Sequence, residues 1–202
     1  ILWNVLTFYR MYAKGVVSAE IASGQAPQAS HILDKWVLSR LAATHSTVTT
    51  ALENYNTPLA GRAIQDFVAE LSTWFVRRSR DRIKGGDAQA KETLDVLGFV
   101  LVETSKLLAP FMPFLSEHIF KDLTGKISVH LEKWSEVRTG NDKLEADMVA
   151  LGNFVEMALR IRKENNLKVR QPLAEIQYVG DLDKELEQIL ADELNVKKVS
   201  QV

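Results

Sequence analysis

Residues 71–84 read LSTWFVRRSRDRIK, and the rest of the chain is best understood outward from this stretch. Its first half carries apolar residues at helical spacing, and its second half places five cations and one acid within eight residues. The formal net charge of the whole chain is only −1, so this positive charge is concentrated rather than general. Basic charge gathered at one helix end favours an anionic partner, and a nucleic-acid backbone is the first candidate. Cations in a last helical turn also complement the helix dipole, so charge alone leaves a structural role open.

On both sides of this stretch, apolar residues recur at helical spacing. We expect helices over residues 31–55, 58–83, 88–108, 114–123 and 141–165. Thr57 is the expected cap of the second helix, with Pro58 at its first position, and Asp87 is the expected cap of the third. The third helix is apolar around much of its circumference, which predicts the most buried place. The sequence therefore predicts a mainly α fold, an antiparallel bundle of four or five long helices.

The pattern changes near residue 166, and three parts follow from it. Residues 1–30 read as the end of an incoming linker helix and a loop, and residues 31–166 as the helical bundle. Residues 167–202 read as the start of a small α/β unit, with strands at 174–179 and 196–202 around a helix at 182–194. A further short segment, residues 127–131, alternates in polarity and is expected to be extended.

Composition excludes several classes of site. The chain has no Cys, which removes disulfides and thiolate metal sites, and its four His residues are too scattered to indicate zinc. No apolar run approaches the roughly 20 residues that span a bilayer, so no membrane partner is expected. The start lacks Met and a cationic leader, and both ends are expected to continue in a longer protein. Asp66 and Glu70 have the spacing of an acid pair, but an ordinary solvated face is the expectation.

The cations of residues 77–84 fall into two sets on a helical wheel of 100° per residue with Leu71 at the apolar centre. Arg78 and Arg82 continue the apolar stripe, so we expect them to cover the bundle end or to pair with acids on other helices. The opposite side carries a second set, Arg77, Arg80 and Lys84. These side chains are better placed to contact a phosphate or an unstacked base. Trp74 shares the spacing of the apolar stripe, so a core position is expected over a stacking platform.

A second cationic group follows the last long helix and includes Arg162, Lys168 and Arg170. It is either a solvated helix end or a phosphate contact, and the sequence leaves both open. We expect no catalytic and no metal-binding residue. The candidate nucleic-acid-binding residues are Arg77, Arg80, Lys84, Arg78, Arg82, Trp74, Arg162, Lys168 and Arg170.

Five stretches together carry a resemblance to a known family. They are LWN and FY within residues 2–9, DKWVLSRL at 34–41, AIQDF with LSTWFVRRSR at 63–80, LLAPFMPFLSE at 107–117, and SVHL at 128–131 with Trp134 and KVRQPL at 168–173. In this order they resemble the anticodon-binding domain of class I aminoacyl-tRNA synthetases, most specifically that of isoleucyl-tRNA synthetases. The resemblance covers about residues 1–176. The VRRSR run distinguishes the chain from the valyl enzymes.

The resemblance implies a fragment of a cytoplasmic, monomeric ligase that attaches isoleucine to its tRNA using ATP. Its partners would be the tRNA for isoleucine and the missing catalytic domain of the same protein. The chain contains neither a HIGH-type nor a KMSKS-type signature and no Gly-rich nucleotide loop. ATP, with Mg²⁺ or Zn²⁺, is therefore expected in other parts of that protein, and no cofactor in this chain. The alternatives are the same domain of a valyl enzyme, or a structural or protein-interaction bundle.

Overall fold

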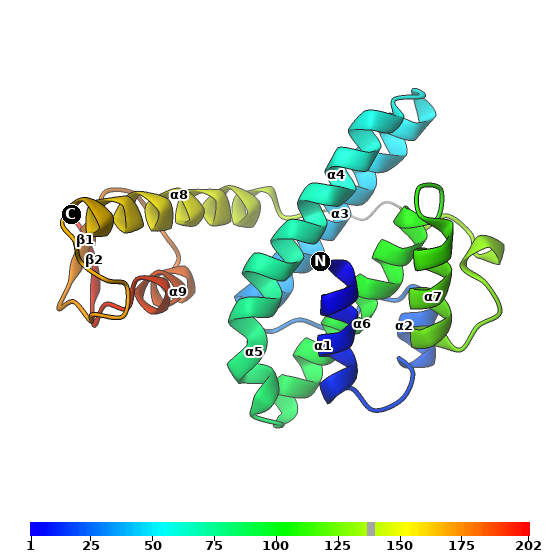
Figure 1. The fold of residues 1–202 in the computed structure, drawn as a ribbon, viewed down its shortest axis with the longest axis horizontal. Helices are drawn as coiled ribbons and strands as arrows, with labels where there is room; N and C mark the ends of the chain where they lie inside the picture. The colour runs from blue at the N-terminus through cyan, green and yellow to red at the C-terminus, as the bar shows by residue number, and fades with distance from the viewer. Residues whose placement is uncertain (137–139) are drawn as a thin grey trace. The chain divides into compact units, whose positions relative to one another are not determined.

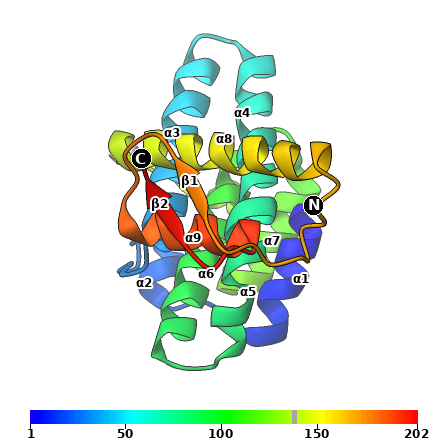
Figure 2. The same ribbon diagram turned by 90° about the vertical axis from the view of Figure 1, so that its left-hand side faces the viewer.

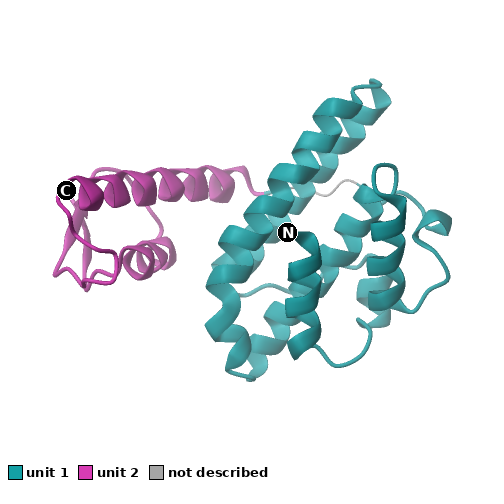
Figure 3. Ribbon diagram, in the orientation of Figure 1, with its two compact units in different colours: residues 1–140 teal, residues 141–202 magenta. Residues whose placement is uncertain are grey.

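A computed structural model describes residues 1–136 and 140–202. The chain forms two compact units, Ile1–Gly140 and Asn141–Val202 (Figure 3). The described residues are mainly helical, with one small parallel sheet in the second unit, so the predicted fold class is confirmed. The boundary differs from the expected one at residues 166 and 167. Helix α8, Asp142–Glu164, packs against α9, Lys184–Leu194, and therefore groups with the C-terminal segments.

The first unit is a bundle in which long helices lie side by side (Figures 1 and 2). Its elements are α1 (Leu2–Tyr12), α2 (Ala19–Ala22), α3 (Ile32–Glu53), α4 (Thr57–Glu70), the π-helix η1 (Leu71–Val76), α5 (Arg77–Lys84), α6 (Ala88–Leu108), α7 (Pro113–Thr124) and the 3₁₀-helix η2 (Val129–Leu131). Figure 1 shows α3 and α4 as a hairpin and α4, η1 and α5 as one continuous rod. Helix α6 is the centre of the unit, because every residue from Val96 to Leu108 is buried, as its apolar circumference predicted.

The N-caps of α4 and α6 are the polar residues expected at such positions, but the cap of α4 lies one residue earlier than predicted. Asp87 caps α6, and its Oδ1 accepts a hydrogen bond of 2.8 Å from the Ala90 amide. Helix α4 begins one residue earlier than expected, because Asn56 rather than Thr57 is its cap. The Asn56 Oδ1 accepts from the Leu59 amide at 3.2 Å, which satisfies one of the free donors of the first turn.

Two segments differ from the predictions. The expected loop at residues 15–30 contains α2, whose Ile21 and Ala22 are buried; four residues are too few to give a periodic signal. The expected extended segment at residues 127–131 is wrong, because the chain forms η2 there. Its alternating apolar residues do not share a buried face, since only Val129 among them is buried. The Glu117 carboxylate holds this turn by accepting from the Val129 amide at 2.9 Å.

The second unit contains α8, α9 and two short strands, β1 (Ile176–Tyr178) and β2 (Val199–Gln201). The strands are parallel, with Ile176 opposite Val199, and the α9 segment connects them (Figure 2). Helix α9 turns its buried residues, among them Leu186 and Leu194, toward this small core. The predicted α/β unit is thus present, with α8 as an additional part of it.

Candidate nucleic-acid interface

The basic stretch of residues 71–84 is not an uninterrupted α-helix. Its first six residues form the π-helix η1, in which hydrogen bonds run from i to i+5. Each residue after it is therefore turned by about one position relative to a regular wheel. The buried stripe that includes Leu71 continues through Phe75, Val76, Ser79 and Ile83. The regular wheel had Arg78 and Arg82 continue this stripe, whereas after the π turn the buried positions are Ser79 and Ile83.

Arg82 is held inside the unit by a polar network that joins α3, α5 and α6. Its Nη2 lies 2.7 Å from Asp34 Oδ1 and 3.0 Å from Ser79 Oγ. The Thr93 hydroxyl donates to the second Asp34 oxygen at 3.0 Å. Asp34 is only 1% exposed, and burial raises the pKa of its carboxyl although the Arg82 guanidinium opposes this shift. Arg82 therefore pairs with an acid on another helix, as expected.

Arg78 and Trp74 form a stacked pair on the surface. The guanidinium carbon of Arg78 lies 3.5 Å from the centroid of the Trp74 ring, which is a cation–π contact. Trp74 is only partly buried, whereas its spacing predicted a core position. The physical reason is again the π turn, because its extra residue rotates the helix so that Phe75 and Val76, rather than Trp74, point into the core. The indole thus becomes a partly exposed aromatic surface beside the cations.

The remaining three cations of the stretch, Arg77, Arg80 and Lys84, are exposed. The Arg77 Nε donates to the Thr73 carbonyl at 3.1 Å. The Arg80 guanidinium lies 5.5 Å from the centroid of the Phe8 ring, which belongs to α1. We refer to these three cations with Trp74 and Phe8 as the basic face.

The sequence offered no signal for Phe8 in this role, because nothing in it indicated that α1 lies beside α5. Within the basic face, guanidinium groups can form bidentate hydrogen bonds with a phosphate, and aromatic rings can stack on an unpaired base. The Lys84 ammonium lies 3.5 Å from Asp81, and both side chains are largely exposed, so this contact leaves Lys84 open to solvent.

The second cationic group lies in the second unit and separates into two kinds of residue. Arg162 is only 4% exposed, and its Nη2 donates to the carbonyls of Lys168, Val169 and Gln171. It therefore holds the turn after α8 from inside the second unit. Lys168 and Arg170 are exposed on the turn that Arg162 holds, so they are the accessible members of this group.

The acidic and histidine side chains of the described residues are spread over the units. No group of three or more His, Cys, Asp or Glu side chains is placed to hold a metal ion among them. Glu70, one half of the acid pair noted in the sequence, instead accepts from the Arg40 Nε at 2.8 Å. None of the described helices is both long enough and apolar enough to cross a membrane.

The sequence of this chain matches one protein family and a set of related proteins. The family described as "Anticodon-binding domain of tRNA ligase" matches residues 34–178. An isoleucine–tRNA ligase of Deinococcus radiodurans is 39% identical over 98% of this chain, which corresponds to 19% of that protein. Isoleucine–tRNA ligase 2 of Bacillus thuringiensis subsp. konkukian is 42% identical over 97% of the chain and 20% of its own length. A Streptomyces avermitilis isoleucine–tRNA ligase is 37% identical over 98% of the chain. The chain thus spans about a fifth of the length of these relatives.

Proposed function

Because the chain belongs to the family of anticodon-binding domains of tRNA ligases, we propose that it recognises the anticodon arm of a tRNA. The tRNA is that for isoleucine, and the chain acts as one part of an isoleucine–tRNA ligase. Relatives with that name, at 37% to 42% identity over nearly the whole chain, support isoleucine over valine. They also favour tRNA recognition over a purely structural bundle.

The observation that carries the proposal is the basic face of the first unit. Arg77 and Arg80 are exposed on one rod beside two aromatic rings, in a chain whose net charge is close to zero. Phosphate contacts from such cations set the position and register of an RNA, while contacts with base edges set its sequence preference. Lys168 and Arg170 of the second unit are exposed and supply further phosphate contacts.

The mechanism assigned to this chain is positional rather than chemical. Binding of the anticodon arm orients the rest of the tRNA toward the reactive centre, which lies in another part of the longer protein. ATP and any metal ion are used there, and the acceptor end receives isoleucine there. We place the whole ligase in the cytoplasm and propose that it acts as a monomer.

A titration with an RNA stem-loop that copies the anticodon arm of the isoleucine tRNA tests the proposal. Arg77→Ala and Arg80→Ala should each lower the affinity and reduce the slope of log K against log salt by about one, because each removes one phosphate contact. Lys121→Ala is the matched control, because Lys121 is an exposed cation on α7, outside the basic face.

Two results would count against the proposal. Unchanged affinity and salt slope in both arginine variants would remove the basic face from the interface. Equal affinity for a stem-loop with a different anticodon would reduce the function to binding of the RNA backbone without recognition of the anticodon.

A further inference from the structure

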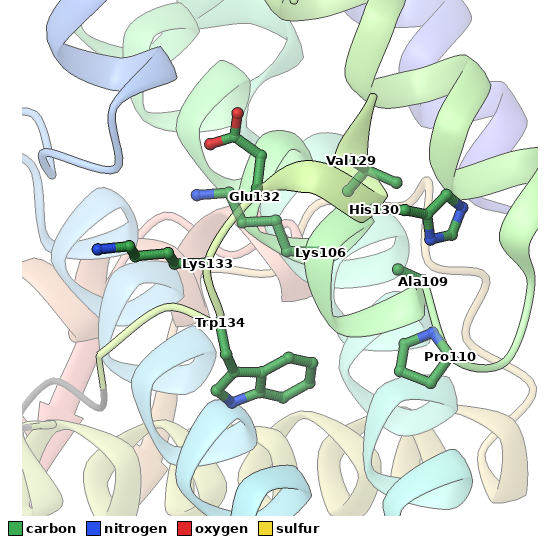
Figure 4. Close-up of a pocket in the computed structure, with 8 residues that line it drawn as sticks. All are labelled: Lys106, Ala109, Pro110, Val129, His130, Glu132, Lys133 and Trp134. Carbon is green, nitrogen blue, oxygen red and sulfur yellow. The ribbon is translucent and has the colours of Figure 1, made fainter. Parts of the chain in front are cut away.

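A hollow of about 240 Å³ lies in the first unit and is lined by none of the residues of the basic face. Figure 4 shows the side chains that surround it. It forms where the C-terminal end of α6 meets the segment around η2, and we call it the Trp134 hollow. Its lining includes Lys106, Pro110, His130, Lys133 and Trp134. Helix α6 has 21 residues, so this end lies about 30 Å along the helix from the turn that joins α5 to α6. The hollow is therefore a separate place on the surface.

Trp134 is held as a fixed aromatic wall. Its indole N–H donates to the Thr49 hydroxyl at 2.9 Å, and its ring centroid lies 5.6 Å from that of His45, which is buried. The side chain nevertheless remains 40% exposed, so part of the ring stays open to solvent. Figure 4 shows Trp134 with the rings of Pro110 and His130 around the hollow. A ring held in this way can accept another planar ring at little entropic cost.

The charges around the hollow divide into a paired and an available set. Lys106 is only 9% exposed, and its Nζ donates to Glu103 Oε1 at 2.7 Å, so a buried acid balances its charge. Glu132 is paired with Lys126 at 2.9 Å. Lys133 is exposed at the rim and forms no ion pair with any other residue that the structure describes. The hollow thus combines an aromatic wall with an available cation.

We propose that the Trp134 hollow takes one unstacked nucleotide of the bound tRNA, with its base against the Trp134 indole and its phosphate at Lys133. This inference rests on the proposed function. Aromatic side chains that stack bases, next to cations that track the backbone, are how proteins hold single-stranded nucleotides. A surface for an apolar protein partner would instead need a broad hydrophobic patch without the charged rim. The hollow gives the RNA a second anchoring point on the first unit.

The test uses the whole chain labelled with 5-fluorotryptophan and observed by ¹⁹F NMR. The four Trp residues, at positions 3, 36, 74 and 134, give one resonance each, assigned by single Trp→Phe substitutions. On addition of the anticodon stem-loop, we expect the Trp74 resonance to report the basic face and the Trp134 resonance to report the hollow. Trp36 is 4% exposed and serves as the internal control that should not move.

The outcomes separate this inference from the function on which it rests. A shift of Trp74 without a shift of Trp134 would overturn the hollow as a nucleotide site and leave the proposed function standing. No measurable affinity for the stem-loop would count against the proposed function itself. Abasic substitution at one loop position should cancel the Trp134 shift while leaving that of Trp74. A mixture of nucleoside monophosphates without RNA should leave Trp134 unmoved, and a shift equal to that caused by the stem-loop would overturn the assignment to tRNA.

Variants provide a second readout of the same site. Trp134→Leu should weaken stem-loop binding about tenfold, because it removes a base-stacking surface, whereas Trp134→Phe should keep most of the affinity. Lys133→Ala should lower the salt slope by about one, and Lys121→Ala should not. Thermal unfolding of each variant shows whether it is folded. Folded Trp134→Leu and Lys133→Ala proteins with the affinity of the unsubstituted chain would refute the proposal.

Discussion

The pairing of Arg82 with Asp34 leads to a prediction about stability rather than RNA binding. In Arg82→Met, Asp34 keeps the hydrogen bond from Thr93 but loses the only cation that the structure places against its buried carboxylate among the described residues. Removing one partner of a buried ion pair costs about 3–5 kcal/mol, because it leaves an uncompensated charge. The Arg82 side chain retains 12% exposure, which admits some solvent. We therefore expect a loss near 3 kcal/mol, at the low end of that range.

The loss should depend on pH and on Asp34 itself. Burial already raises the pKa of the Asp34 carboxyl, and removal of the opposing Arg82 charge should raise it further. A carboxyl with a raised folded-state pKa stabilises the fold below its unfolded pKa and loses this contribution as pH rises through the folded value. The penalty of Arg82→Met should therefore be smaller at pH 4 than at pH 7. Adding Asp34→Asn to the variant should recover much of the stability at pH 7, because no charge is then buried.

The assay is urea unfolding followed by tryptophan fluorescence. All four Trp residues lie within residues 1–140, so the signal reports the first unit alone. A double variant no more stable than Arg82→Met would refute the argument from an uncompensated charge. The salt slope of RNA binding should stay that of the unsubstituted chain, since Arg82 is a structural residue; a slope reduced by one would instead make it a phosphate contact.

Three further predictions concern single positions. Gly98→Ala should cost about 1–3 kcal/mol, because an added Cβ would lie 2.8 Å from the Tyr9 hydroxyl oxygen; an unchanged melting temperature would contradict this. Burial lowers the pKa of His31 to about 4, so His31 stabilises the fold above about pH 6.5 and this contribution is lost as pH falls through 4. Its Nδ1 accepts from the Leu33 amide, and urea unfolding of His31→Asn, which keeps a cap, should show a weaker acid dependence. Arg162→Met should speed amide hydrogen exchange in residues 168–171, and an unchanged rate would show that Arg162 does not hold this turn.

The long helices could be predicted because their evidence is local. Apolar periodicity located α3, α6 and α8, and the N-cap of α6 followed from the preference of Asp for that position. The boundary between the two units was harder to predict. The apolar stripe of α8 shows that this helix must pack against another element, but it does not show which one. The structure pairs α8 with α9, and that choice depends on contacts that the one-dimensional pattern does not contain.

The candidate interface was predictable in composition and less so in geometry. A helical wheel separated the arginines of α5 into two sets. Because the wheel describes a regular helix, it also placed Trp74 in the core, where the structure leaves this residue partly exposed. A π turn leaves no clear signature in hydrophobic periodicity, because it shifts the pattern by one residue and the pattern then resumes. The Trp134 hollow could not be predicted from the sequence either. It depends on tertiary contacts of residues 129–134 with α6 and of Trp134 with Thr49 on α3.

The single extra residue in the turn of η1 decides which arginines reach the solvent. In a regular helix the position seven residues after Leu71 would face α6, and that position is Arg78, a long cation with no room in a packed interface. The π turn gives the inward position to Ser79, which is fully buried and small enough for close packing of α5. Arg78 then rests on Trp74, while Arg77 and Arg80 face outward. Distortions of this kind are frequent at functional sites, and here the distortion lets one short rod meet a packed core on one side and an anionic partner on the other.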